Sequence, residues 1–292
     1  MLTRKFTSKQ ISKSIIKPIF LLILSILPQL AQAQTTILGQ VINADTGVGI
    51  PFTNLGIVSK GEGTVSDKDG VFTLVYTHPN DEVTISAIGF ESRSLSLEAL
   101  SELEQIGLQP IVYETAWVEV SAERIGGEEK IYGVRNRNRG LSIGFGNAQL
   151  GTEIGAPIRI KKPSWIKSAN FVLNHAKGDS LLLRVNIYKF DKGEVGPNIL
   201  QENIVIEQEQ RRGTITVDLQ PYNLILEQDV LLSLEWLRNF DETGNKDITF
   251  DTKGGGRLKG TYYRFYSNGA FQKMDAIGPR KPCFYFIGRE LD

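Results

Sequence analysis

The residue types that most often bind metals or transfer protons are scarce in this chain. Its 292 residues include two histidines, His78 and His175. A catalytic zinc ion needs about three histidine or carboxylate ligands around one open coordination position. Neither histidine begins an H-x-x-E or H-E-x-x-H pattern; His78 precedes a proline in a turn-like stretch, and His175 lies where a β-type pattern ends. The sequence therefore predicts no metal site and argues against zinc-dependent hydrolysis.

The candidate nucleophiles carry no specific motif either. Cys283 is the one cysteine, so no internal disulfide can form. It could act as a nucleophile or form an intermolecular bridge, but its apolar surroundings favour burial as a small hydrophobic residue. No Gly-x-Ser-x-Gly motif occurs. The glycine-rich run 254–260 lacks the Gly-Lys-Ser/Thr ending of a phosphate loop and is interpreted as a hairpin loop.

Paired carboxylates would be needed for glycoside hydrolysis, and the sequence alone cannot pair them. Glu235 is the most notable acidic residue because it interrupts an otherwise apolar run, residues 230–236. Side chains alternate between the two faces of a strand, so Glu235 is expected opposite Leu234 and Trp236, on a solvent-facing side. We predict no catalytic residue, no cofactor and no enzymatic activity; an envelope hydrolase is the third-ranked alternative.

Outward-facing aromatic residues are a second kind of candidate site, because jelly-roll modules often hold sugars on aromatic platforms. Trp236 is in phase with Leu232 and Leu234, and Trp165 with Phe171 and Leu173, so both tryptophans are predicted to lie in the core. Trp117 is the best candidate for an exposed aromatic residue, although a contact between domains would explain it equally well. The predicted ligand or interface residues are Trp117, Tyr188, Tyr262 and Tyr266.

The region that organises the chain, residues 39–90, has the pattern of short strands joined by turns. Phe72, Leu74 and Tyr76 alternate with the residues between them, which predicts a strand with two different faces. Asp67-Lys68-Asp69-Gly70 predicts a tight turn in which an aspartate accepts hydrogen bonds from backbone amides. Calcium binding is the alternative, but the third oxygen ligand and the later glutamate of an EF-hand loop are missing.

Several linked elements of this region together resemble the carboxypeptidase regulatory-like domain, a small transthyretin-like β-sandwich of the type common in exported proteins of Bacteroidetes. The resemblance covers about residues 35–121, and its residues form turns and core, so it implies no catalytic position. In that group the domain often precedes the plug of TonB-dependent outer-membrane receptors, but too little chain follows here for a plug and a barrel. The elements are Gly39-Gln40-Val41, Thr46-Gly47, Ile50-Pro51, Asn54, Gly63-Thr64-Val65-Ser66-Asp67, Gly70-Val71-Phe72 and Ile88-Gly89-Phe90.

The first 33 residues have the pattern of a secretory signal peptide. Five basic residues precede an apolar run from Ile19 to Leu27, and Ala31-Gln32-Ala33 matches an A-x-A cleavage site. The apolar run is shorter than the about 20 residues needed to span a bilayer. Removing this segment leaves 28 basic and 33 acidic residues, a net charge near −5. Such a charge gives no general attraction to nucleic acid, so we expect an exported protein with no nucleic-acid partner.

A polar stretch, residues 122–139, is predicted to link two domains. It contains Gly126–Lys130 and the start of a basic run, Arg135–Gly140, which is interpreted as a solvated loop rather than a phosphate or RNA site. The predicted organisation is therefore a signal peptide at 1–33, a regulatory-like β-sandwich at 34–121, a linker at 122–139 and a second domain at 140–292.

From residue 140 onward the pattern is again that of short strands separated by turns, including the turn signal Ser267-Asn268-Gly269. About eight or more such strands predict a jelly-roll-like β-sandwich. Residues 154–162 and 183–188 also resemble the second domain of Bacteroidetes proteins that contain the regulatory-like domain. The expected protein is all-β and acts as a non-catalytic binding or assembly module in the periplasm, at the outer membrane or at the cell surface. Carbohydrate binding by the second domain is the alternative.

Overall fold

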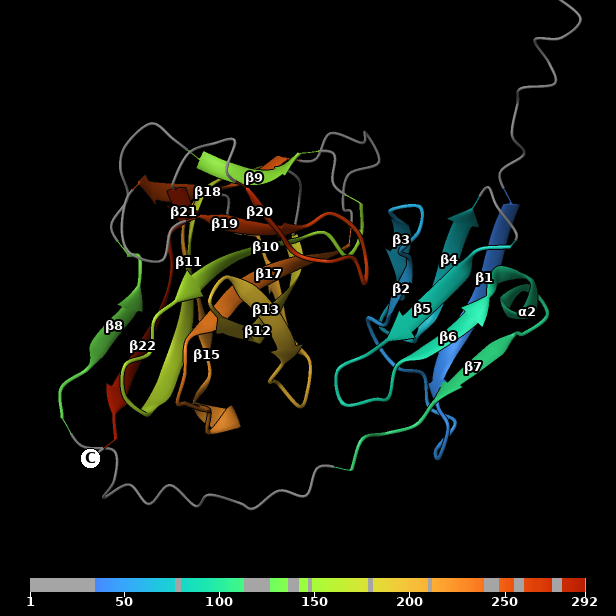
Figure 1. Ribbon diagram of the computed structural model, residues 1–292, viewed down its shortest axis with the longest axis horizontal. Coiled ribbons are helices and arrows are strands. Elements are labelled where there is room, and N and C mark those ends of the chain that lie inside the picture. Colours follow the sequence, from blue (N-terminus) through green and yellow to red (C-terminus); the bar gives the residue numbers. More distant parts are fainter. Residues whose placement is uncertain are drawn as a thin grey trace, which may run out of the picture.

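The computed structural model contains two β-domains that lie side by side (Figure 1). It describes residues 35–76, 80–112, 127–135, 142–146, 149–177, 181–209, 212–238, 247–254, 260–274 and 280–291. The predicted all-β fold is confirmed, since nearly all regular structure in these ranges is strand. Trp117, His78, the predicted signal peptide and most of the two runs 135–140 and 254–260 lie outside the described residues.

The first domain is a sandwich of two small sheets whose inner faces form one apolar core. Strand β4 is buried at Phe72, Leu74 and Tyr76 and exposed at the residues between them, as the alternation predicts. A short helix, α2 (Leu97–Ser101), is capped at its N-terminus by Ser96, whose side chain accepts a hydrogen bond from the Ala99 amide. The first sheet contains β4 (Val71–Tyr76), β1 (Thr35–Asn43) and β7 (Gln105–Leu108), and the second contains β3 (Glu62–Val65), β2 (Asn54–Ile57), β5 (Glu82–Ser86) and β6 (Arg93–Ser96).

The turn before β4 forms as the sequence predicts. Asp67 Oδ1 accepts hydrogen bonds from the amides of Asp69 and Val71, both at 2.9 Å. Gly70 has a φ of 79°, and a Cβ there would lie 2.4 Å from the Val41 carbonyl oxygen. Only glycine fits this close approach without strain.

The second domain is built on a seven-stranded sheet and an eight-stranded sheet that enclose a large apolar core. In the seven-stranded sheet, β12 places Leu183, Val185 and Ile187 in this core and turns Arg184 and Asn186 to the opposite face. That opposite face carries the site described below. The sheet contains, in spatial order, β13 (Glu194–Asn198), β12 (Leu181–Asp191), β17 (Val230–Arg238), β10 (Glu153–Ile158), β19 (Thr261–Arg264) and β20 (Gln272–Met274), with β14 (Ile204–Gln208) paired to β12.

The eight-stranded sheet covers the other side of the core and buries Cys283 next to it. Its long central strand, β11, pairs with several neighbours. A 3₁₀ turn, η3 (Gln220–Tyr222), precedes β16 (Ile225–Leu226), which is one of these neighbours. The sheet contains β21 (Arg280–Pro282), β18 (Asp247–Gly254), β11 (Ser164–Lys177), β22 (Phe284–Glu290) and β8 (Lys130–Gly133), with β15 (Gly213–Asp218) and β16 (Ile225–Leu226) paired to β11 and β9 (Ser142–Gly146) paired to β18.

A β-bulge in β11 makes one core prediction wrong. Trp236 is buried in the core as expected, but Trp165 is only half-buried and is not part of it. The pairing of β11 with β22 shifts register between Ile166 and Ser168. An extra residue at a bulge reverses the alternation, so Ile166 enters the core in phase with Ala169 and Phe171.

The second domain begins earlier than the predicted boundary at residue 140. Strand β8 lies within the stretch interpreted as a linker, yet it pairs with β22 over Lys130–Gly133. The charged residues around β8 made this segment resemble a linker in the sequence, because an edge strand can be polar on its outer face. In the described part of the chain, no helix has the length and apolar character needed to cross a membrane.

Candidate binding site between the two domains

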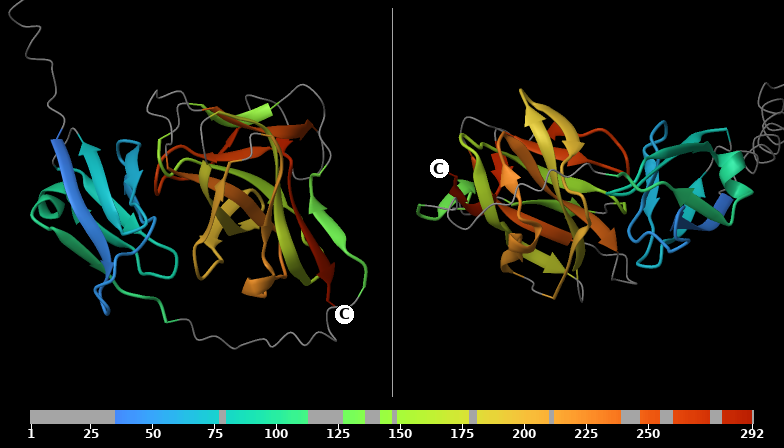
Figure 2. Two further views of the ribbon diagram at one scale, coloured as in Figure 1. Left: turned by 180° about the vertical axis from the view of Figure 1, so that it is seen from behind. Right: turned by 90° about the horizontal axis from the view of Figure 1, so that it is seen from below.

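A turn from the second domain docks against the first domain and fixes the two together. It is the predicted turn between β19 and β20, and Ser267 at its tip is fully buried. Asn268 Nδ2 donates to the Thr84 carbonyl oxygen at 2.7 Å, and Ser86 Oγ donates to Asn268 Oδ1 at 2.6 Å. Ser267 Oγ donates to the Thr64 carbonyl oxygen at 2.9 Å. Figure 2 shows the side of the first domain that carries β2 and β3 facing the second domain.

Two glycines make room for this turn. A Cβ at Gly56 would lie 2.0 Å from the Ser267 carbonyl oxygen, and one at Gly151 would lie 1.9 Å from Ser267 Oγ. Real Cβ atoms do not approach so closely, so the turn could not dock in its present position with a larger residue at either place. Apolar contacts add to the interface, because Val65 of the first domain packs with Leu182 and Leu237 of the second.

Next to the turn, four charged residues form a row across adjacent strands on the outer face of the seven-stranded sheet. Arg184 on β12 is the register partner of Glu235 on β17, Glu235 that of Glu153 on β10, and Glu153 that of Arg264 on β19. Arg184, Glu235 and Glu153 are buried, and the side chain of Arg264 is 14% exposed. The order is cation, anion, anion, cation, so each carboxylate has one arginine beside it and the row neutralises itself.

Arg184 connects this row to the first domain. Its Nε and Nη2 donate to Glu235 Oε2 at 2.8 and 2.7 Å. Its Nη1 donates to the Phe52 carbonyl oxygen at 2.7 Å and to Asn203 Oδ1 at 3.1 Å. Phe52 has a φ of 55°, in the left-handed region that bulky residues seldom adopt. The hydrogen bond to Arg184 is one of the interactions that hold this strained carbonyl in place.

Glu153 has all of its hydrogen-bonding capacity occupied by protein groups. Its Oε1 accepts from Ser233 Oγ and, at 2.9 Å, from Asn186 Nδ2. Its Oε2 accepts from the Tyr188 hydroxyl at 3.1 Å and forms an ion pair with Arg264 Nη1, also at 3.1 Å. Burial raises the pKa of the Glu153 carboxyl, while Arg264 opposes that rise. This carboxylate orders its neighbours and has no oxygen free for a substrate.

Glu235 and Arg264 differ from Glu153 because each keeps one polar atom unpaired. Glu235 Oε2 is bound by Arg184 and by Asn186, but the buried Oε1 has no partner. Arg264 Nε is likewise buried without a partner. The Arg264 guanidinium lies 4.4 Å from the centre of the Phe271 ring and 5.3 Å from that of Tyr188, which holds it in place through cation–π contacts. Buried polar atoms without partners are uncommon in proteins, so these two atoms distinguish Glu235 and Arg264 from the rest of the row.

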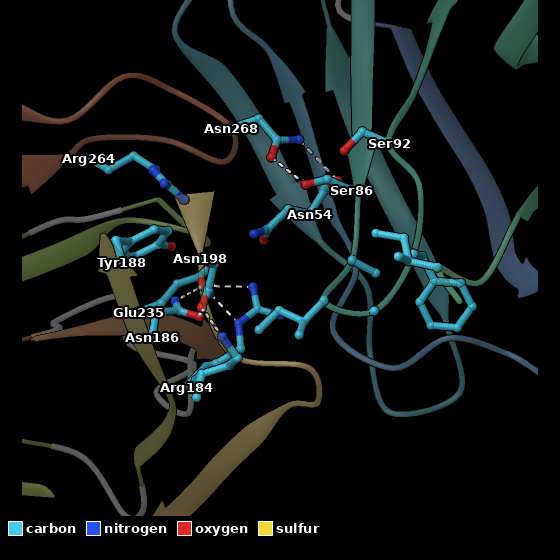
Figure 3. Close-up of a pocket in the computed structure, with 16 residues that line it drawn as sticks. Asn54, Ser86, Ser92, Arg184, Asn186, Tyr188, Asn198, Glu235, Arg264 and Asn268 are labelled. Atoms are coloured by element: carbon cyan, nitrogen blue, oxygen red, sulfur yellow. Dashed lines mark hydrogen bonds and ion pairs between the residues drawn. The ribbon is translucent and has the colours of Figure 1, made fainter. Parts of the chain in front are cut away.

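Both of these residues line a pocket of about 310 Å³ between the two domains. Figure 3 shows Arg184, Asn186 and Glu235 on one side of this pocket and Asn54, Ser86 and Ser92 on the other. The remaining lining residues are Ala87, Ile88, Gly89, Phe90 and Ile111 from the first domain, and Tyr188, Asn198, Leu200, Arg264 and Asn268 from the second. The pocket is thus a polar site that neither domain forms alone.

The predicted ligand or interface residues are brought into different surroundings. Tyr188 and Tyr262 lie on the outer face of the seven-stranded sheet but are buried, at 6% and 5% exposure, so neither is the exposed aromatic residue expected. Tyr188 lines the interdomain pocket, and Tyr262 packs against Phe190 instead. The Tyr266 hydroxyl donates to the Val58 carbonyl oxygen at 3.4 Å, across the domain interface. Burial raises the pKa of Tyr188 well above its usual range, so it stays protonated as a donor.

The expectation that Glu235 faces solvent is wrong. Glu235 does lie on the face opposite Leu234 and Trp236, as the alternation predicts, but it is fully buried. The first domain and Arg184 cover that face, which strand periodicity cannot reveal. Glu153 and Arg264 were not singled out from the sequence at all, because their positions next to Glu235 depend on strand register.

The fold and this site define a two-domain all-β protein with a polar pocket at its domain interface. Residues 37–115 match the family model of the CarboxypepD_reg-like domain, so the first domain is a carboxypeptidase regulatory-like domain. This confirms the resemblance of the first domain to the carboxypeptidase regulatory-like domain. No match was found among curated proteins.

Solved structures share only a distant likeness with this chain. The cysteine protease and lectin-like domains of Cwp84, a surface layer associated protein of Clostridium difficile, align at 11% identity and a TM-score of 0.38 over 56% of this chain and 36% of that one. The infectious bursal disease virus Gx strain structure aligns at 10% identity and a TM-score of 0.26, over 88% of this chain and 65% of that one. The chain therefore spans less than two thirds of either, and similarity at this level assigns neither fold nor function.

Proposed function

We propose that this protein is an exported, non-catalytic binding module of the cell envelope, and that its ligand occupies the pocket between the two domains. The observation that carries this proposal is that Glu235 and Arg264, which each keep one buried polar atom unpaired (the acceptor Glu235 Oε1 and the donor Arg264 Nε), both line one pocket. A polar ligand that offers both hydrogen-bond donors and acceptors would suit this lining. The signal-peptide pattern of residues 1–33 and the regulatory-like domain support an envelope location.

The arrangement of the two glutamates favours binding over hydrolysis. Two carboxylates adjacent to a pocket would suit a glycosidase if both reached the substrate. Glu153, however, is engaged by four donors and is not among the residues that line the pocket. Glu235 has a single unpaired oxygen, which can accept a hydrogen bond. Among the described residues that line the pocket, no second carboxylate is available to act with it in hydrolysis.

Carbohydrate recognition is the second candidate function, and the chemistry of the pocket lining favours it. A sugar hydroxyl both donates and accepts, so it can hydrogen-bond with either a carboxylate or a guanidinium group. The amides of Asn54 and Asn198 offer further donors and acceptors, and Phe90 and Tyr188 supply apolar surface. Recognition of a polar segment of another envelope protein would use the same groups.

The test is a glycan-array screen of residues 34–292, because the pocket needs both domains. Ser92→Trp would fill the pocket from its exposed side while leaving every residue of the charged row unchanged, and Ser94→Trp, a nearby exposed position that does not line the pocket, is the matched control. Glu235→Gln can place an amide where the free oxygen lies, turning an acceptor into a donor. Glycan binding that Ser92→Trp abolishes and Ser94→Trp preserves establishes the carbohydrate function.

If no glycan binds, the same variants are compared in pull-downs from envelope extracts. A protein partner lost with Ser92→Trp and retained with Ser94→Trp places the partner in the pocket. Ligands or partners that bind equally well to both variants would overturn the interdomain pocket as the binding site.

A further inference from the structure

A second polar pocket lies in the second domain, on the side away from the regulatory-like domain, where β8 and β22 run (Figure 1). Its volume is about 320 Å³. It forms where the end of β10 meets the edge strand β8 and the short strand β21. The lining residues are Ile131, Tyr132, Gly133, Arg159, Lys161, Lys281 and Glu290.

The lining is dominated by positive charge. Arg159, Lys161 and Lys281 face one acidic residue, Glu290. Glu290 Oε2 already lies 2.6 Å from Lys130 Nζ. The hydrogen bond from Lys130 lowers the pKa of the Glu290 carboxyl, so the negative charge of Glu290 is already paired with a lysine that does not line the pocket. Among the described residues, neither Arg159 nor Lys281 has an ion-pair partner.

Lys281 is the least expected of these cations. It is only partly exposed, and its register partner across the β18–β21 pair is another lysine, Lys253. Like charges directly opposite each other on neighbouring strands destabilise a sheet. Burial lowers the pKa of the Lys281 amine; Cys283 opposes this shift, and Lys253 adds to it. A partly buried amine beside another cation is an unfavourable arrangement unless an anion compensates it.

A neutral donor accompanies these cations. The hydroxyl group of Tyr132, a residue that lines the pocket, is buried and has no hydrogen-bond partner in the described part of the chain. Arginine and lysine together with a phenol hydroxyl are groups that commonly bind the oxygens of tetrahedral anions.

We propose that this pocket binds the phosphate or sulfate group of an anionic ligand, with Arg159, Lys161 and Lys281 supplying the charge. The proposal is independent of the interdomain site, because the two pockets share no lining residue. The chain as a whole is not basic, so the attraction is local to this pocket and does not indicate nucleic acid. The group can belong to a free anion or to a phosphorylated lipid.

The test uses residues 34–292 and three probes: inorganic phosphate, inorganic sulfate, and vesicles of phosphatidylglycerol in phosphatidylcholine. Calorimetry is expected to show saturable binding of at least one probe. Lys281→Gln removes one charge-assisted contact, so we expect binding to weaken roughly tenfold. Arg159→Gln is a second variant, and Lys189→Gln, an exposed lysine outside this pocket, is the matched control.

Weaker binding by the two pocket variants and unchanged binding by Lys189→Gln would support the site. Under that result, binding of the vesicles without the free ions assigns the group to a lipid headgroup, and binding of the free ions assigns it to a soluble anion. Absence of binding to all three probes by the folded protein would overturn the proposal. Equal weakening by Lys189→Gln would also overturn it, because the attraction would then be non-specific.

Discussion

The two polar pockets of this protein handle charge in opposite ways. Between the domains, Arg184, Glu235, Glu153 and Arg264 form a buried row that neutralises itself and leaves one carboxylate oxygen and one N–H without a hydrogen-bond partner. In the second pocket, cations outnumber anions and Lys281 lies opposite another lysine. Paired buried charges fix geometry and select for a polar ligand of low charge, whereas unpaired cations that are exposed or half-buried attract an anion. The stability of the buried row should therefore depend on each of its four residues, whereas the stability of the second pocket should not depend on any one of its cations.

The largest effect is expected when the buried row is broken. Arg184→Leu leaves Glu235 as an uncompensated buried charge, so the free energy of unfolding should fall by about 3–5 kcal/mol, measured by urea denaturation. The control, Arg238→Leu on the same β17–β12 pair, removes an exposed ion pair with Glu207 and should cost about 1 kcal/mol or less. Equal losses for the two variants would mean that the row contributes no more than a surface pair.

A smaller effect is expected from a clash at the domain interface that forms the first pocket. Gly56→Ala places a Cβ against the Ser267 carbonyl, and overpacking of this kind costs about 1–3 kcal/mol. Small-angle scattering should show a larger radius of gyration as the domains separate. Gly196→Ala, where a Cβ would come no closer than 3.2 Å to another atom, serves as the control. An unchanged radius for Gly56→Ala would show that the turn is not needed to hold the domains together.

The charged row should also give stability a particular pH dependence. Burial raises the pKa of Glu153 in the folded state, so between the ordinary glutamate pKa of about 4.3 and the raised value the folded protein holds more protons than the unfolded chain. The contribution of Glu153 to the free energy of unfolding is then fully present below about pH 4.3 and is lost as the pH rises through the folded-state pKa. The free energy of unfolding of the wild type minus that of Glu153→Gln should fall as the pH increases. A difference that rises instead would mean that Arg264 outweighs burial.

The smallest effect, of opposite sign, is expected in the second pocket. Lys281→Met removes the repulsion between Lys253 and Lys281 and a partly buried amine. In the absence of anions, the variant should therefore be more stable by about 0.2–1 kcal/mol. Thermal denaturation in a phosphate- and sulfate-free buffer would measure this gain. A loss of stability would show that Lys281 has a structural partner. The two pockets would then no longer differ in whether their charges are paired.

The sequence predicted most local features because they depend on neighbouring residues. The alternation of Phe72, Leu74 and Tyr76, the turn at Asp67 and the turn at Ser267–Asn268 all form as expected. The wrong or missed features involve register. One extra residue at the bulge moved Trp165 out of phase, and the polar pattern of β8 gave no sign of its pairing with β22.

The sequence by itself determined the all-β fold, the regulatory-like domain and the face of each strand on which Glu235 and Tyr188 lie. Only the tertiary structure decided that this face is buried, since another domain covers it. It also decided that Glu153, 82 residues before Glu235 in the chain, becomes its cross-strand neighbour. Strand periodicity is a property of adjacent residues, whereas burial by a second domain and the alignment of distant strands depend on the packing of the whole chain.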